Sequence, residues 1–244
     1  MLERKFSHVG NFTGYMGIVS LLVQAGKPGQ RILDIPAGNG LLSRQLREAG
    51  HETVCADINR AAADYIYADL SQPLPFADAE FDTVLCLEGV EHIVDSAALI
   101  GELCRVTKSG GRIIISLPNI QNAFSRFNFL CTGCFYQFPP WASRHLKPGE
   151  MIDRGHIAPL SFLHLRYLFQ HCHARLVQLE GDKWKKKWLI PFLLPFIFGG
   201  WLWMTRAIVR QNATPVDGGR ESVRFLFSKP LMFSRSLILV FEKM

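Results

Sequence analysis

Residues 31–40, with the sequence RILDIPAGNG, constrain the fold of this chain more than any other stretch. They place an apolar strand from Arg31 to Ile35, which includes Asp34, before a glycine turn, and residues 41–50 then have the pattern of a helix that ends at Gly50. In open α/β sheets this order brings glycines and the free N–H groups of a helix against a bound nucleotide. The stretch therefore predicts a ligand-binding turn at Gly38 and Gly40.

A second strand is expected at HETVCAD, and it ends in Asp57. This carboxylate follows the glycines by roughly 20 residues, the spacing at which an acidic side chain meets ribose hydroxyls. Considered alone, this glycine pattern would also fit a tight loop between a strand and a helix in another doubly wound protein.

The rest of the chain continues the alternation of strand and helix. Short strands are expected before Asp69 in YIYADL, at FDTVLCLEGVEHI and at SGGRIIISLPN, with a helix from Ser96 to Thr107 between the last two. This alternation predicts an α/β fold, in which a mostly parallel sheet carries helices on both faces.

Taken together, these motifs resemble the class I S-adenosylmethionine (SAM)-dependent methyltransferases over residues 13–182 and 235–243. DIPAGNG is similar to their first motif, CAD to their ribose-binding motif, ADL to their adenine-side motif and KSGGRIIIS to the strand before the substrate loop. The resemblance implies a Rossmann-like, doubly wound sheet of seven strands, mostly parallel with a final antiparallel strand, and SAM as the cofactor.

The resemblance also assigns cofactor contacts. Gly38 and Gly40 would line the methionine portion, Asp57 the ribose hydroxyls, Asp69 the adenine amine and Asp34 the amino-acid end. Further contacts are implied for Ala37, Ile58, Leu70 and Glu88. One departure is Pro36, which stands where the family usually has its first glycine; because proline cannot adopt a left-handed conformation, residues 35–37 should differ from the common turn.

Acidic and histidine side chains gather after the fourth expected strand. Glu88, Glu91 and His92 in CLEGVEH would share one face if the chain turned into a helix there, and His156 in DRGHIAPLS could fold back over the same edge. Carboxylates and imidazoles together suit Mg, Mn, Fe or Zn ions. The pattern resembles ubiquinone-biosynthesis O-methyltransferases and small-RNA 3′-terminal 2′-O-methyltransferases, and the resemblance implies these four residues as metal ligands.

Alternatives remain open at these positions. The Glu-His pair could shape its loop and His156 could cap the next helix, or His92 or His156 could act as the general base without a metal. Asn119, just after the fifth strand, is a candidate for hydrogen bonding to substrate or an ordinary turn residue.

The run WLIPFLLPFIFGGWLWMT at 188–205 contains no charge, follows KWKKK and precedes Arg206 and Arg210. Its length approaches the roughly 20 residues of a membrane span, but Pro191, Pro195 and the Gly199-Gly200 pair disfavour one straight helix. In the family that the chain resembles, strands such as 174–180 and 236–243 pair as a hairpin. Residues 181–229 would then have to leave the sheet and return to it on the same side of the membrane, which excludes a single crossing of the bilayer.

The expected organisation is one domain over residues 1–244 with an apolar insertion at 183–230. We expect this insertion to lie in a membrane interface, with Trp188, Trp201 and Trp203 at headgroup depth and the lysines Lys183, Lys185, Lys186 and Lys187 facing anionic lipid. An apolar lid over the active site or a dimer contact is the alternative.

Composition limits the possible partners. The chain has 244 residues, 48% of them hydrophobic, and a net charge of +6, which suits an anionic partner. The six cysteines include one CxxC pair and no second one, so a reduced, cytoplasmic setting is expected. The first 12 residues lack the continuous apolar stretch of a signal peptide, and we therefore expect a cytoplasmic protein that binds the membrane peripherally.

The expected function is SAM-dependent methyl transfer to a small-molecule or lipid-like acceptor, at a hydroxyl, on the membrane surface. An RNA methyltransferase is one alternative, but nucleic acid is disfavoured because no basic run interleaved with aromatics occurs outside the membrane-like one. A non-catalytic SAM-binding membrane adaptor is the other.

Overall fold

The computed structural model describes residues 14–59, 63–138, 155–184, 190–210 and 219–244. Its centre is a seven-stranded sheet in the order β3-β2-β1-β4-β5-β7-β6. The strands are β1 (Arg31–Asp34), β2 (Glu52–Asp57), β3 (Ile66–Tyr67), β4 (Phe81–Leu87), β5 (Thr107–Pro118), β6 (Ala174–Gly181) and β7 (Ser236–Lys243).

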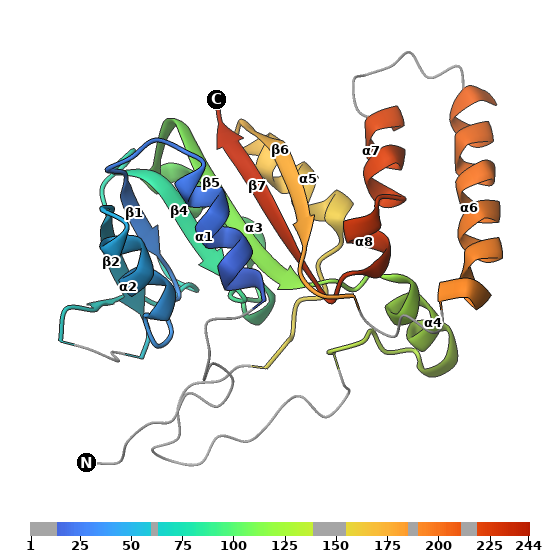
Figure 1. Ribbon diagram of the computed structural model, residues 1–244, viewed down its shortest axis with the longest axis horizontal. Helices are drawn as coiled ribbons and strands as arrows, with labels where there is room; N and C mark the ends of the chain where they lie inside the picture. The colour runs from blue at the N-terminus through green and yellow to red at the C-terminus, as the bar shows by residue number, and fades with distance from the viewer. Residues whose placement is uncertain (1–13, 60–62, 139–154, 185–189, 211–218) are drawn as a thin grey trace.

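Helices connect most of the strands, as Figure 1 shows. They are α1 (Tyr15–Gln24), α2 (Leu41–Glu48), the 3₁₀ turn η1 (Val90–His92), α3 (Ser96–Val106), α4 (Ala123–Thr132), α5 (Phe162–His171), α6 (Ile190–Arg210), α7 (Gly219–Leu226) and α8 (Lys229–Phe233).

Strands β1 to β5 pair in parallel, whereas β7 is antiparallel to both β5 and β6. Parallel strands need crossover connections, and α2 and α3 supply two of them. The predicted fold class, including the final antiparallel strand and the β6-β7 hairpin, is confirmed.

The pleat of the central strands sorts their side chains into two buried layers. In β5, Ile113 and Ile115 pack in the layer that contains α3 and α5, while Ile114 packs in the layer with α1 and α2. Because successive side chains of a strand point to opposite faces, strands that are covered on both faces are apolar throughout. In Figure 1, α1 lies in front of the sheet and α3 and α5 lie behind it.

The segment between β6 and β7 differs in one respect from the expectation. Residues Ile190–Arg210 form one continuous helix, α6, although the prolines and the Gly199-Gly200 pair were expected to disfavour a single straight helix. Pro191 lies in the first turn, where a backbone N–H has no partner within the helix, and Pro195 removes one hydrogen bond while the rest of the helix is kept. In Figure 1, α6 stands beyond α7 at the end of the molecule farthest from β1 and β2.

Helix α6 contacts α7 and α4. None of the helices in the described part of the chain has both the length and the apolarity for a bilayer crossing. Trp188 and Lys185 to Lys187, for which an interfacial position was expected, lie outside the described residues.

Candidate active site

The carboxyl ends of neighbouring parallel strands bring three acidic residues to one edge of the sheet. Asp34 ends β1, Asp57 ends β2 and Glu88 follows β4 directly. Since β1 pairs with both β2 and β4, these residues lie on adjacent strands at the edge where open α/β sheets bind ligands.

The glycine turn after β1 opens with a cis Ile35–Pro36 peptide bond. Gly38 and Gly40 have φ values of 57° and 70°, which favour glycine. A Cβ on Gly40 would clash with the Tyr65 hydroxyl, whereas one on Gly38 would meet nothing within 4 Å. The turn therefore leaves open space beside the Gly38 backbone, as a ligand would require.

Asp57 joins the turn to the second strand. Its two carboxylate oxygens accept hydrogen bonds from the backbone N–H of Gly38 at 2.9 Å and of Asn59 at 2.7 Å. Burial raises the pKa of Asp57, while these two hydrogen bonds lower it. The contacts hold the carboxylate in a fixed orientation at the end of β2.

Asp34 is more deeply buried and accepts a hydrogen bond from the Ser43 hydroxyl at 2.5 Å. Burial raises its pKa to about 7, and the nearby charge of Asp57 contributes in the same direction. Because a buried carboxylate costs free energy without a charged partner, this position suits a ligand that brings an ammonium group.

The remaining predicted cofactor residues lie around the same edge. Ala37 is buried and donates its N–H to the Ala56 carbonyl, while Ile58 follows Asp57 and is partly buried. Asp69 accepts hydrogen bonds from the backbone and hydroxyl of Ser71, and the neighbouring Leu70 packs against the core. Asp69 thus organises the turn that follows β3.

The structure separates Glu88 from the expected metal ligands. The helical turn η1 begins only at Val90, and Glu88 precedes it with a φ of 50°. Its carboxylate accepts a hydrogen bond from the Ser116 hydroxyl at 3.0 Å, and burial raises its pKa to about 7. The prediction that Glu88 shares a helical face with Glu91 and His92 is therefore wrong.

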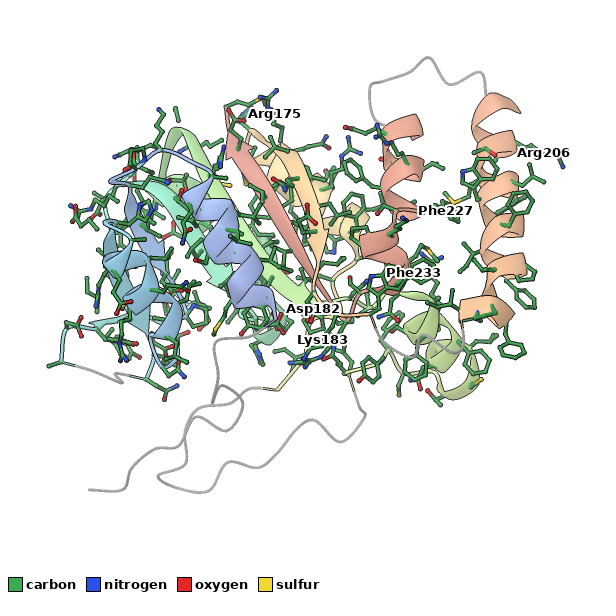
Figure 2. The ribbon with its side chains drawn as sticks, viewed as in Figure 1. Arg175, Asp182, Lys183, Arg206, Phe227 and Phe233 are labelled. Carbon is green, nitrogen blue, oxygen red and sulfur yellow. The ribbon has the colours of Figure 1, made fainter. Side chains whose placement is uncertain are left out.

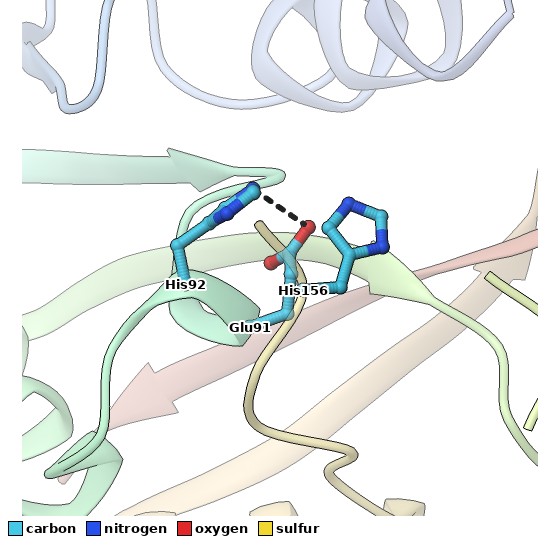
Figure 3. Close-up of side chains that lie close together, drawn as sticks. All are labelled: Glu91, His92 and His156. Atoms are coloured by element: carbon cyan, nitrogen blue, oxygen red, sulfur yellow. Dashed lines mark ion pairs between the residues drawn. The ribbon is translucent and has the colours of Figure 1, made fainter. Parts of the chain in front are cut away.

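Glu91, His92 and His156 do come together (Figure 3). One ligand atom from each lies within 4.8 Å of the others, and the His92 Nε2 to Glu91 Oε1 distance is 3.9 Å. Two imidazoles and one carboxylate form a ligand set found at zinc and non-haem iron sites.

The Glu91 carboxylate is the most unusual member of this group. It is fully buried, and neither oxygen has a hydrogen-bond partner among the described residues. Burial, followed by the charge of Glu88, raises the pKa of Glu91 well above its usual value. A buried carboxylate normally has hydrogen bonds or a cation, so Glu91 fits a bound metal ion.

Backbone carbonyls fix both imidazole rings. His92 Nδ1 donates to the Gly155 carbonyl at 2.7 Å, and His156 Nδ1 donates to the Gln137 carbonyl at 2.9 Å. In the neutral imidazole a proton on Nδ1 leaves the lone pair on Nε2, which is the arrangement of metal-binding histidines. The backbone of Glu91 also accepts from Ile157 and Ala158, which ties the His156 loop to η1.

The alternative role of His156 as a helix cap is not the one observed. Helix α5 is capped by Ser161, whose side chain accepts from the backbone of His164. His156 instead packs edge-on against His92, with ring centroids 5.0 Å apart.

Gln137, which the sequence did not single out, positions His156. It has a φ of 74°, unusual for a residue other than glycine, and its Oε1 accepts a hydrogen bond from Arg235 Nε at 3.1 Å. This contact holds the backbone carbonyl that binds His156.

Gln137→Ala should lower the affinity for Zn²⁺ by about tenfold, the lower end of the range for residues that orient metal ligands. Gln137→Glu, which keeps an acceptor for Arg235, should retain the wild-type affinity. Titration calorimetry of both variants checks this, and an alanine variant that binds like wild type would remove Gln137 from the site.

Tyr15 was also missed. It begins α1 and lies partly buried, and burial followed by the charges of Glu88, Asp34 and Glu91 raises the pKa of its hydroxyl. Its place on the same helical face as Val19 and Val23 was the available signal, because that face packs on the sheet.

The hydrogen bonds of Asn119 are all made within the protein fold. Its buried side-chain amide donates to the carbonyls of Leu231 at 2.8 Å and Ser234 at 3.1 Å, and its Oδ1 accepts from Gln121. These contacts fasten α8 to the end of β5, so the geometry gives Asn119 a structural role in place of the expected substrate contact.

Comparison with known proteins agrees with this geometry. The family described as "Methyltransferase domain" matches residues 33–115. A demethylmenaquinone methyltransferase of Renibacterium salmoninarum is 34% identical over 99 residues, or 36% of this chain and 41% of that protein. A ubiquinone biosynthesis O-methyltransferase of Aromatoleum aromaticum is 29% identical over 126 residues, which are 46% of this chain and 53% of that protein. The chain thus matches about half or less of these relatives' lengths.

Solved structures extend the similarity over nearly the whole fold. A SAM-dependent methyltransferase from Archaeoglobus fulgidus aligns with a TM-score of 0.57 at 17% identity, covering 93% of this chain and 94% of its own. The [4+2]-cyclase SpnF aligns with a TM-score of 0.56 at 15% identity, and the alignment covers 93% of this chain and 81% of SpnF. Because these two proteins carry different reaction names, the fold alone does not determine the reaction.

Proposed function

Since this chain carries a class I SAM-dependent methyltransferase domain, we propose that it transfers the methyl group of SAM to a hydroxyl of a small, lipid-like acceptor at a membrane surface. The observation that carries the transferase proposal is the turn at Gly38, which is open beside its backbone and held to the Asp57 carboxylate. An acidic residue at the end of the second strand, next to a glycine turn, fits a ribose with two free hydroxyls.

The residues at the sheet edge fit the cofactor. Asp57 would accept hydrogen bonds from the ribose, and the buried Asp34 would face the amino-acid end. Bound SAM supplies a methyl group on a sulfonium, which a nucleophile attacks in line. The protein's contribution is to hold the acceptor oxygen in that line and to exclude water.

An acceptor hydroxyl must also lose its proton. Glu91, His92 and His156 would hold a divalent ion, which lowers the pKa of a hydroxyl that binds it and orients its oxygen. The group fits because Glu91 is buried without a hydrogen-bond partner among the described residues and because backbone carbonyls orient both imidazoles.

For the acceptor, we propose a ring hydroxyl of a quinone-precursor type. The support is the similarity to relatives named for menaquinone and ubiquinone biosynthesis, together with the apolar surface of α6. The membrane location rests on the same helix: its outward side chains include Phe196 and Trp203, which are 78% and 73% exposed, next to the exposed Arg206. Aromatic side chains beside cations are typical of segments that lie in a membrane interface.

Mass spectrometry tests the transferase proposal. Incubation with SAM that carries a CD₃ methyl group and a cellular lipid extract should give a lipid-like product that contains the CD₃ group, and omitting the protein should abolish it. A protein that binds SAM but labels nothing in either the lipid or the water-soluble fraction would be a non-catalytic SAM-binding protein.

A further inference from the structure

Helix α4 exposes apolar side chains that the proposed chemistry does not use. Leu130 is 81% exposed, and Phe127 and Phe129 are also exposed. The helix follows β5 at the carboxyl edge of the sheet and contacts α6. Figure 1 shows α4 beside the N-terminal end of α6, which also exposes apolar side chains such as Phe192 and Phe196.

The charged residues within these two helices have one sign. Neither 123–132 nor 190–210 contains Asp or Glu, and their charged residues are Arg126, Arg206 and Arg210. Lys183 is exposed just before α6, and Lys185 to Lys187 follow it in the sequence. In Figure 2, Arg206 points away from α7, and Lys183 lies next to Asp182 just after the end of β6. An anionic surface therefore complements the cations of α4 and α6, and the carboxylates of Asp182 and of Glu221 in α7 lie on other elements.

Aromatic contacts continue from α4 to the candidate active site. Phe129 stacks on Phe135 with ring centroids 4.4 Å apart, and Phe124 packs edge-on against Tyr136. The same segment then places the Phe138 ring 5.3 Å from that of His156. A short run of chain thus joins the exposed face of α4 to the proposed metal ligands.

We propose that α4 and residues 135–138 form, with α6, one surface that docks on an anionic lipid bilayer and receives the acceptor from it. This inference rests on the proposed function and narrows it, because the acceptor becomes an amphiphile whose apolar chain lies along α4 while its hydroxyl reaches Glu91, His92 and His156. Lipid is the occupant that the observations favour, because the face is apolar and aromatic and the charged residues of α4 and α6 themselves are all cations.

Vesicle binding of two leucine variants tests the inference. Leu130→Glu should lower partitioning onto vesicles of phosphatidylglycerol and phosphatidylcholine by at least about tenfold, because it removes apolar area and adds a repelled charge. Leu21→Glu is the matched control: Leu21 is a 68% exposed leucine on α1, and we expect wild-type binding. Leu130→Gln should weaken binding less, which separates the loss of apolar area from the added charge.

Each variant should bind SAM as the wild type does, and this distinguishes failure of docking from failure of the proposed function. Equal vesicle binding by Leu130→Glu and wild type would overturn the inference, as would an equal loss in Leu21→Glu. Absence of wild-type binding to anionic vesicles, together with a dimer that Leu130→Glu dissociates, would assign the surface to a second copy and also overturn it.

Discussion

Replacing Asp57 with alanine is expected to weaken SAM binding by about 1.5–3 kcal/mol, the scale for losing hydrogen bonds to a charged group. This corresponds to roughly 10- to 150-fold in the dissociation constant. The substitution removes the carboxylate that would meet the ribose, and it also leaves the Gly38 and Asn59 N–H groups without their acceptor. Titration calorimetry measures the change directly.

Asp64→Ala provides the control, because Asp64 is an exposed aspartate close to Asp57 in the sequence that pairs with Arg47 on the surface. It should bind SAM like the wild type. Thermal denaturation of both variants separates a lost ligand contact from a loosened turn. An Asp57→Ala protein that keeps its melting temperature and binds SAM within twofold of wild type would show that Asp57 does not contact the ribose.

Glu91→Gln is expected to lower both Zn²⁺ affinity and methyl transfer by at least about 100-fold. Glutamine has nearly the shape of glutamate but cannot supply an anionic ligand, and a metal ion held by two histidines and one carboxylate depends on that charge. The metal-free variant should be at least as stable as the metal-free wild type, because burying an unpaired carboxylate costs free energy. Calorimetry with Zn²⁺, the transfer assay and thermal denaturation give the three readouts.

Glu48→Gln, a change at the exposed end of α2, should alter none of these. Chelation should reduce wild-type transfer to the level of the Glu91→Gln protein, and added metal should restore it. Full turnover after exhaustive chelation, with unchanged activity in Glu91→Gln, would show that no metal ion takes part. His92 and His156 would then have an acid-base or structural role.

The fold could be predicted because its signals are local. Strand residues such as 113–115 are apolar on both faces, glycines occupy the turn after β1, and Gly50 follows the end of α2. Each of these local patterns predicts the secondary structure of its own segment. The alternation of strand and helix then leaves few possible connections between the segments.

The candidate site was less predictable because it depends on contacts between distant residues. Asn119 binds carbonyls at 231 and 234, and Gln137 binds Arg235, pairs about 100 residues apart that no local pattern reveals. Glu88 does not share the helical face expected for it, because η1 begins only at Val90 and Glu88 has a positive φ and a hydrogen bond with Ser116. His92 and His156, in contrast, were correctly expected to meet, since both follow strands at the same edge.

The central claim is that the sheet edge at Gly38, Asp34 and Asp57 binds SAM. Calorimetric titration of the wild-type chain with SAM, S-adenosylhomocysteine and NAD tests it most directly. The account predicts that SAM and S-adenosylhomocysteine bind at a single site and that NAD does not compete with them. No heat of binding with SAM to the folded protein, or tighter binding of NAD, would contradict it.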